Sequence, residues 1–311
     1  MSLALHGVLA PVVSTFDDDG ALARAPFERN VRAHLAAGLQ GVLVAGSSGE
    51  AALLDDAERR TLVEWARAVV PEERTLLVGI GAETARQTIA RARDAHAAGA
   101  DAVLVVAPHY YARMMSVDAL AAHYRAVADA SPLPVLLYNV PAYAHLVLPA
   151  ELVHAMAEHG NVVGMKDSAG DLAMLDRYLE AQSPTFRVLT GSGGTVQTAL
   201  ERGASGAILA VALFAAGEAT TVADAVAHGD GAGAAAAQAR LVGLARDVAA
   251  ALGPPGIKAA MDLLGLSGGP PRAPLLPLTT VQRSAVAAAL AQAGLLVPTG
   301  TGGAVAVGAT A

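Results

Sequence analysis

The sequence contains no cysteine among its 311 residues. This absence excludes disulfide bonds, thiolate metal sites and a cysteine nucleophile, and it leaves the redox compartment open. Charged residues are scarce at 16%, whereas hydrophobic residues make up 54%, which fits a large buried core and argues against disorder. The net charge of −7 offers no basic surface, so we expect no nucleic-acid partner.

Membrane and targeting signals are also lacking. Segment 130–150 is uncharged and long enough to cross a bilayer, but its four prolines argue against a membrane helix. Residues 1–11 lack the basic region and the long apolar run of a signal peptide. We therefore expect a cytoplasmic protein that does not bind a membrane.

Eight short apolar runs recur between residues 7 and 210, separated by segments of helical periodicity. The runs are continuous rather than alternating, as is typical of strands covered on both faces. Three of them follow a glycine that ends the preceding helix, at Gly38, Gly99 and Gly203. The alternation predicts parallel βαβ units that close into an α/β fold, the (β/α)₈ TIM barrel. The runs are Gly7–Val13, Gly41–Ala45, Thr75–Ile80, Ala102–Ala107, Pro134–Tyr138, Val162–Lys166, Arg187–Thr190 and Gly206–Ala210.

After Ala210 the pattern changes to helix without strand. We expect a barrel over 1–211, a C-terminal helical extension packed on it over 212–296, and a poorly ordered tail over 297–311. The extension is expected to break at Gly253–Gly256 and at Gly268–Pro271. Two helix starts, Thr84 with Gln87 and Thr279 with Gln282, match the capping-box pattern.

The apolar run that begins at Val162 ends on Lys166. Because side chains alternate along a strand, Lys166 and Ser168 share one face and Met165 takes the other. An amine on the inner face of a barrel would be partly desolvated, which favours the neutral form that attacks a ketone to give a Schiff base. Taken alone, a lysine at this place is more often a strand-end lysine that extends into water, so the rest of the chain must decide.

Further polar residues follow other runs, at the strand ends where barrels of this kind have their active sites. Taken singly, each has a simpler structural explanation: a serine–glycine turn, a buried tyrosine ring or a helix start. Gly191–Gly194 could also be the phosphate loop common after the seventh strand of such barrels. Together, however, a lysine, a phenol and serine hydroxyls are the groups that imine chemistry requires. The segments are Gly46–Glu50, Pro108–Tyr111, Tyr138–Pro141 and Gly191–Gly194.

Gly46–Glu50, Tyr138–Pro141 and Gly164–Ser168 resemble, in order, three signatures of the dihydrodipicolinate synthase / N-acetylneuraminate lyase family, and the similarity extends from Leu5 to Leu296. The resemblance implies that Lys166 is the Schiff-base lysine for pyruvate or another 2-oxo acid and that Tyr138 shuttles protons. Ser47 stands where most of the family has the first of two threonines, and it retains the hydroxyl.

The resemblance also implies that Ser47 and Ser48 bind the carboxylate of the 2-oxo acid. Tyr110 matches a tyrosine that enters the neighbouring subunit's site, although the sequence leaves open whether Tyr110 or Tyr111 does so. A homo-oligomer, commonly a tetramer of tight dimers, follows from the same resemblance. The expected catalytic residues are Lys166, Tyr138, Ser47 and Tyr110, and the expected substrate-binding residues are Ser48, Ser168, Gly191 and Ile208.

A metal-dependent aldolase is the rival mechanism, and it would need histidines and carboxylates gathered at one strand end. The nine histidines are scattered instead, at positions 6, 34, 96, 109, 123, 145, 154, 159 and 228. We therefore expect neither a metal nor a cofactor.

The substrate is narrowed by departures from the family pattern. The synthases carry an arginine two residues after the proline of the Tyr-Asn-Val-Pro motif, and this chain has Tyr143 there. A phenol cannot replace a bidentate carboxylate clamp without loss of charge and geometry. Other stretches resemble 4-hydroxy-2-oxoglutarate aldolase most closely, namely Pro108–Met114, Gly164–Ser168, Pro255–Lys258 and Gly268–Pro274.

We therefore expect a class I aldolase that cleaves a 4-hydroxy-2-oxo acid, 4-hydroxy-2-oxoglutarate, to pyruvate and glyoxylate. Three alternatives stay open: 4-hydroxy-tetrahydrodipicolinate synthesis, cleavage of a sugar 2-oxo acid, and a barrel that binds a 2-oxo acid without turnover. The acceptor aldehyde and the stereochemistry are not fixed by the sequence.

Overall fold

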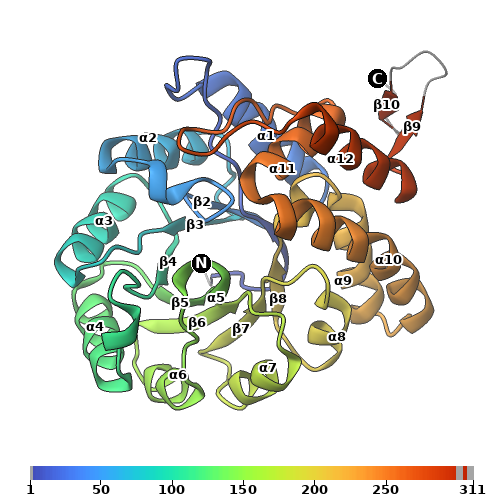
Figure 1. The fold of residues 1–311 in the computed structure, drawn as a ribbon. Coiled ribbons are helices and arrows are strands. Elements are labelled where there is room, and N and C mark those ends of the chain that lie inside the picture. The colour runs from blue at the N-terminus through green and yellow to red at the C-terminus, as the bar shows by residue number, and fades with distance from the viewer. Residues whose placement is uncertain (1–2, 299–303, 307–311) are drawn as a thin grey trace.

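A computed structural model describes residues 3–298 and 304–306. Eight parallel strands follow one another around a closed barrel, and β8 pairs with β1 (Figure 1). The strands are β1 (Gly7–Ala10), β2 (Gly41–Val44), β3 (Thr75–Gly79), β4 (Ala102–Val106), β5 (Val135–Asn139), β6 (Val162–Asp167), β7 (Arg187–Thr190) and β8 (Gly206–Ile208). Every predicted run overlaps one strand, and β5 and β6 extend one residue further, to Asn139 and Asp167, so the predicted (β/α)₈ fold is confirmed.

Helices cover the outside of this barrel (Figure 1). They are α1 (Arg24–Ala36), α2 (Asp56–Arg67), α3 (Ala85–Ala97), α4 (Val117–Ala130), α6 (Ala150–Ala157), α7 (Leu172–Leu179), α8 (Val196–Glu201) and α9 (Ala216–Ala227). Short helical turns lie in the loops that follow the strands: η1 (Ala51–Leu53), η2 (Ala112–Met114), α5 (Pro141–Ala144) and η3 (Ala210–Leu213).

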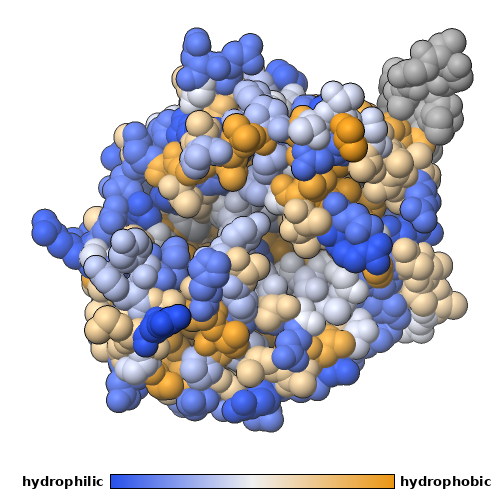
Figure 2. Space-filling model, in the orientation of Figure 1, coloured by the Kyte–Doolittle hydropathy of each residue, from blue (hydrophilic) through white to orange (hydrophobic). Residues whose placement is uncertain are grey.

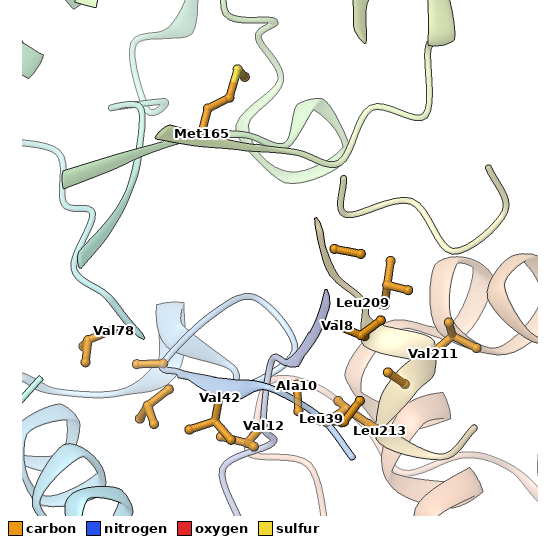
Figure 3. Packing of buried hydrophobic residues seen from close by; sticks show 14 of the residues in the cluster. Val8, Ala10, Val12, Leu39, Val42, Val78, Met165, Leu209, Val211 and Leu213 are labelled. Atoms are coloured by element: carbon orange, nitrogen blue, oxygen red, sulfur yellow. The ribbon is translucent and has the colours of Figure 1, made fainter. Parts of the chain in front are cut away.

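Two apolar layers explain why the strands are buried on both faces. An inner cluster fills the barrel and includes Leu43, Leu136 and Tyr138, whereas an outer cluster lies between the strands and the helices. Met165 belongs to the outer cluster, and Figure 3 shows its side chain pointing away from the barrel axis. Because neighbours on a strand alternate, Lys166 on β6 points inward, as predicted.

Local turn chemistry agrees with most of the sequence signals. Gly38, Gly99 and Gly203 all have positive φ at the ends of helices. Thr279 and Gln282 form the predicted reciprocal capping box. Only half of the capping box predicted at Thr84 forms. The Thr84 hydroxyl accepts from the Gln87 backbone amide, but the Gln87 side chain donates to Asp56 and does not return to Thr84.

The C-terminal extension lies beside the barrel mouth (Figure 1). It comprises α10 (Gly231–Leu244), the π-helical segment η4 (Ala245–Ala250), α11 (Ala251–Leu263) and α12 (Thr280–Gln292). The predicted break occurs inside α11, where Gly253 has φ 57° and ψ −148°. The domain boundary placed after residue 211 stays a prediction.

Two short antiparallel strands, β9 (Leu296–Pro298) and β10 (Ala304–Ala306), are described near the C-terminus. The rest of the predicted poorly ordered tail, 299–303 and 307–311, lies outside the described residues. Within the described part of the chain, none of the helices combines the length and the apolar character needed to cross a membrane.

Candidate active site

A cavity of about 440 Å³ opens between the carboxyl ends of the strands and the C-terminal extension. Figure 2 shows that the face seen in Figure 1 is hollowed near its centre. Seven of the eight site residues expected from the sequence line this cavity, and Tyr110 does not. The seven are Ser47, Ser48, Tyr138, Lys166, Ser168, Gly191 and Ile208.

Tyr138 on β5 and Lys166 on β6 face each other from paired positions. The Lys166 side chain is buried, with 5% of the residue exposed. Its amine donates a hydrogen bond to the Tyr138 hydroxyl at 3.4 Å and lies 4.6 Å from the centre of the tyrosine ring. The amine is therefore directed at the phenol and not into water.

The Tyr138 hydroxyl is subject to opposing effects. Burial raises its pKa, but the charge of Lys166 and hydrogen bonds from Ser47, Ser168 and Lys166 together hold the pKa below its usual value. The Ser47 hydroxyl lies 3.4 Å from the phenol oxygen. A phenol with a lowered pKa, beside an amine and a hydroxyl, is well suited to accept and return a proton.

Ser47 and Ser48 lie on residues 46–50, which we call the serine loop. Both flanks of its backbone are left-handed, with φ 53° at Ala45 and 56° at Glu50. The Gly46 carbonyl accepts hydrogen bonds from the amides of Gly49 and Ala51, which closes the loop on itself. A Cβ on Gly49 would lie 2.9 Å from the carbonyl oxygen of Val12, so the loop packs too closely there for a side chain.

The end of β6 is fixed by a buried link to β5. The Asn139 amide donates to the Asp167 carboxylate at 2.7 Å and accepts from the Leu148 amide at 3.0 Å. Burial raises the pKa of Asp167, the hydrogen bonds from Asn139 and the Ala169 amide lower it, and Asp171 raises it further, so that it stays above its usual value. The link holds both strands that carry Lys166 and Tyr138.

Gly191 leaves room for Lys166. Its amide donates to the Asp167 carbonyl at 2.6 Å, which brings its Cα close to β6. A Cβ at this position would lie 2.8 Å from Lys166 Cε and would also meet the Ser168 hydroxyl. Any larger residue would therefore force the side chains of Ser168 and Lys166 to shift.

Tyr110 and Tyr111 lie apart from this group, at the end of β4. They are 78% and 63% exposed, and their rings meet edge to face at 4.9 Å. The amides of His109 and Tyr110 both donate to the Glu83 carboxylate. The expectation that Tyr110 or Tyr111 completes the site of a neighbouring subunit stays a prediction.

Sequence reasoning missed Arg246. It lies on η4 and lines the cavity, where Lys166 and Arg246 are the charged side chains among the described lining residues. Its guanidinium pairs with Asp247 at 2.6 and 2.7 Å and is well exposed. Nothing in the surrounding alanine-rich sequence distinguishes this arginine, because its significance depends on how η4 meets the barrel.

Tyr143, noted in the sequence for replacing an arginine, does line the cavity. It also borders a neighbouring cavity of about 540 Å³ that contains Glu83 and His109. Burial raises the pKa of the Tyr143 hydroxyl, and the nearby Tyr138 adds to this effect.

Within residues 3–298 and 304–306, no group of three or more histidine, aspartate or glutamate side chains is arranged to hold a metal ion.

The chain is similar to known proteins over most of its length. Residues 4–293 match the model of the dihydrodipicolinate synthetase family. An uncharacterized DapA-like lyase of Halobacterium salinarum is 38% identical over 300 residues, which cover 94% of this chain and 96% of that protein. A probable mitochondrial 4-hydroxy-2-oxoglutarate aldolase of Emericella nidulans is 39% identical over 204 residues, covering 64% of this chain and 66% of that protein.

Solved structures are also similar. The crystal structure of the chloride-inhibited dihydrodipicolinate synthase of Acinetobacter baumannii, complexed with pyruvate, is 28% identical and has a TM-score of 0.88. The match covers 93% of this chain and 99% of that one.

Proposed function

Because the chain belongs to the dihydrodipicolinate synthetase family, whose members are pyruvate-dependent class I lyases and aldolases, we propose that it cleaves 4-hydroxy-2-oxoglutarate to pyruvate and glyoxylate. The observation that carries the proposal is the contact of the Lys166 amine with the Tyr138 phenol in a cavity that also contains Ser47 and Ser48. The amine supplies the nucleophile and the phenol supplies the proton transfer.

In this mechanism the neutral Lys166 amine attacks the keto carbon of the substrate. Loss of one water gives a protonated imine, which acts as an electron sink. Tyr138 accepts the proton of the 4-hydroxyl, the bond between C3 and C4 breaks, and its electron pair passes into the imine. Glyoxylate leaves as the aldehyde, and an enamine of pyruvate stays on Lys166.

The enamine then takes a proton at C3 from Tyr138. One water hydrolyses the imine, which replaces the water lost earlier, releases pyruvate and frees the amine. Ser47 supports the phenol through its hydrogen bond, and the hydroxyls and amides of Ser47 and Ser48 hold the carboxylate next to the keto carbon.

The second carboxylate of the substrate needs a positive partner across the cavity from the serine loop. Arg246 supplies a guanidinium, which binds carboxylates through two parallel hydrogen bonds. A substrate carboxylate would compete with Asp247 for this group. Arg246 therefore favours an aldehyde that carries a carboxylate over a neutral sugar, and both glyoxylate and aspartate semialdehyde meet this condition. The argument against aspartate semialdehyde is Tyr143, which stands where the synthases have an arginine.

We also propose that the chain assembles as a homotetramer of tight dimers, in which Tyr110 reaches the neighbouring site. The exposed side chains of Tyr110, Tyr111 and Met114 support this, because large apolar side chains grouped on one surface favour contact with another protein.

Borohydride trapping with pyruvate tests the mechanism. We expect the peptide that contains Lys166 to gain the mass of a reduced pyruvate adduct, and we expect Lys166→Met to abolish the adduct. Absence of the adduct in the wild-type protein would overturn the Schiff-base mechanism.

The substrate is tested separately, by pyruvate release from 4-hydroxy-2-oxoglutarate and by condensation of pyruvate with aspartate semialdehyde. We expect rapid cleavage and little condensation. Efficient condensation of the semialdehyde, with the adduct on Lys166 intact, would instead favour the synthase.

A further inference from the structure

A buried ion pair joins the serine loop to the C-terminal extension. Lys258 on α11 contacts Glu50 with 2.5 Å between nitrogen and oxygen, and the two side chains are 1% and 0% exposed. The other carboxylate oxygen of Glu50 accepts a hydrogen bond from the Arg272 amide at 2.8 Å. Both oxygens of Glu50 are therefore held by the extension, and Lys258 also donates to the Pro270 carbonyl at 2.8 Å.

Arg272 extends the same connection to the residues that follow the serine loop. Its guanidinium forms two bonds of 2.6 Å to the Glu58 carboxylate on α2. It also donates to the Leu53 carbonyl of η1 at 2.9 Å. Both cations lie over the ring of Phe16, at 4.5 Å for Lys258 and 4.1 Å for Arg272. The extension thus binds the serine loop and the turn η1 that follows it through ion pairs and hydrogen bonds.

These contacts also fix a strained residue in the backbone of the serine loop. Glu50 has φ 56°, a left-handed conformation that is strained for a residue with a side chain. Such strain persists when surrounding contacts fix the residue, and here those contacts come from Lys258 and Arg272. An apolar pair of similar size would fill the space, but it would not direct the Glu50 side chain.

We propose that Glu50 and Lys258 are positioning residues that keep the Ser47 hydroxyl within reach of the Tyr138 phenol, so that the active site is complete only when the extension is docked. The inference rests on the proposed function for the role of Ser47, but the geometry it describes can be measured without turnover.

The test follows the ionisation of Tyr138 by its phenolate absorbance, as the difference between each protein and the same protein carrying Tyr138→Phe. The Ser47 hydrogen bond helps to lower the pKa of Tyr138, so we expect Ser47→Ala to raise it. We expect Glu50→Gln to raise it as well, and to add nothing in the Ser47→Ala background. Removal of the Glu50 charge acts directly in the opposite direction, so an upward shift reports a displaced loop.

A second readout is the rate of pyruvate imine formation, measured by trapping at a temperature well below unfolding. We expect Glu50→Gln to slow it about tenfold in the native background and less than about twofold in the Ser47→Ala background. Equal effects in both backgrounds, or an unshifted or lowered pKa of Tyr138 in Glu50→Gln, would overturn the proposal. If the wild-type protein forms no imine, the proposed function fails. The titration of Tyr138 then still tests whether Glu50 positions Ser47.

Two further variants separate positioning from stability. Glu50→Leu with Lys258→Met replaces the pair by apolar groups and is expected to fold. Its Tyr138 should still have a higher pKa than Tyr138 of the wild-type protein, as in Glu50→Gln. Val153→Ala, in the buried face of α6, is expected to lower the melting temperature without changing either readout. A normal titration in the folded double variant would show that the ion pair is merely structural.

Discussion

Tyr138 illustrates how single residues set the chemistry of the cavity. Its hydroxyl lies in a buried environment that disfavours the phenolate, yet its pKa is held below the usual value of about 10 because Lys166 and the neighbouring hydroxyls stabilise the anion. The two residues are therefore coupled: loss of the Lys166 charge leaves burial as the dominant effect and raises the pKa of Tyr138.

Tyr138→Phe removes the hydroxyl and little else. General acid–base groups contribute about 10²–10⁴-fold, so we expect kcat for cleavage to fall by that range. The ring keeps its place in the inner cluster, so the barrel should still unfold in one cooperative transition, at a cost of about 1 kcal/mol for the lost hydrogen bonds. Steady-state kinetics and thermal unfolding check both parts. A variant that turns over normally would remove Tyr138 from the mechanism.

The sequence predicts residues of the site well where chemistry and strand position coincide. Lys166 ends an apolar run and Ser47 follows one, and parallel strands bring such ends together without further information. Glu50 and Lys258 could not be paired in this way, because their contact depends on how α11 docks. A charged residue in apolar surroundings, as Lys258 is within Gly256–Met261, was the available signal for a buried partner.

At the level of elements, strands and helix ends were predictable because their signals are local. β1 is shorter than its apolar run, which continues to Val13 although pairing with β2 ends at Ala10. The π-helical segment η4 could not be predicted, since its alanine-rich sequence favours an ordinary helix. Such segments are often found at functional sites, and η4 contributes Ala245, Arg246, Ala249 and Ala250 to the cavity.

We expect Arg246→Gln to raise KM for 4-hydroxy-2-oxoglutarate roughly three- to tenfold, because an exposed guanidinium contributes modestly to carboxylate binding. The rate of imine formation with pyruvate should not change, since pyruvate lacks the second carboxylate. Asp247→Asn removes the competing anion and should lower KM. Arg240→Gln, on α10 and outside the cavity lining, is the control. Equal KM values in all four proteins would remove Arg246 from substrate recognition.

On the scale of the whole molecule, the barrel mouth has two different surroundings. On one side the extension reaches the serine loop through Lys258 and Arg272. The loop after β4 instead exposes Tyr110, Tyr111 and Met114. Large apolar side chains grouped on a surface favour contact with another protein, and a second copy of this chain would cover them. The resemblance in the sequence predicts such a contact, made by Tyr110 or Tyr111.

A mixing experiment tests whether a neighbouring chain completes the site. Tyr110→Phe and Lys166→Met should each be nearly inactive alone. If Tyr110 acts across a two-fold interface, dissociation and random reassembly of equal amounts restores one intact site in each hybrid dimer, or roughly a quarter of wild-type activity. Mixing Tyr111→Phe with Lys166→Met shows whether Tyr111 acts instead. Normal activity of both tyrosine variants would contradict the shared site. So would mixtures that recover no activity although sedimentation shows that hybrid dimers have formed.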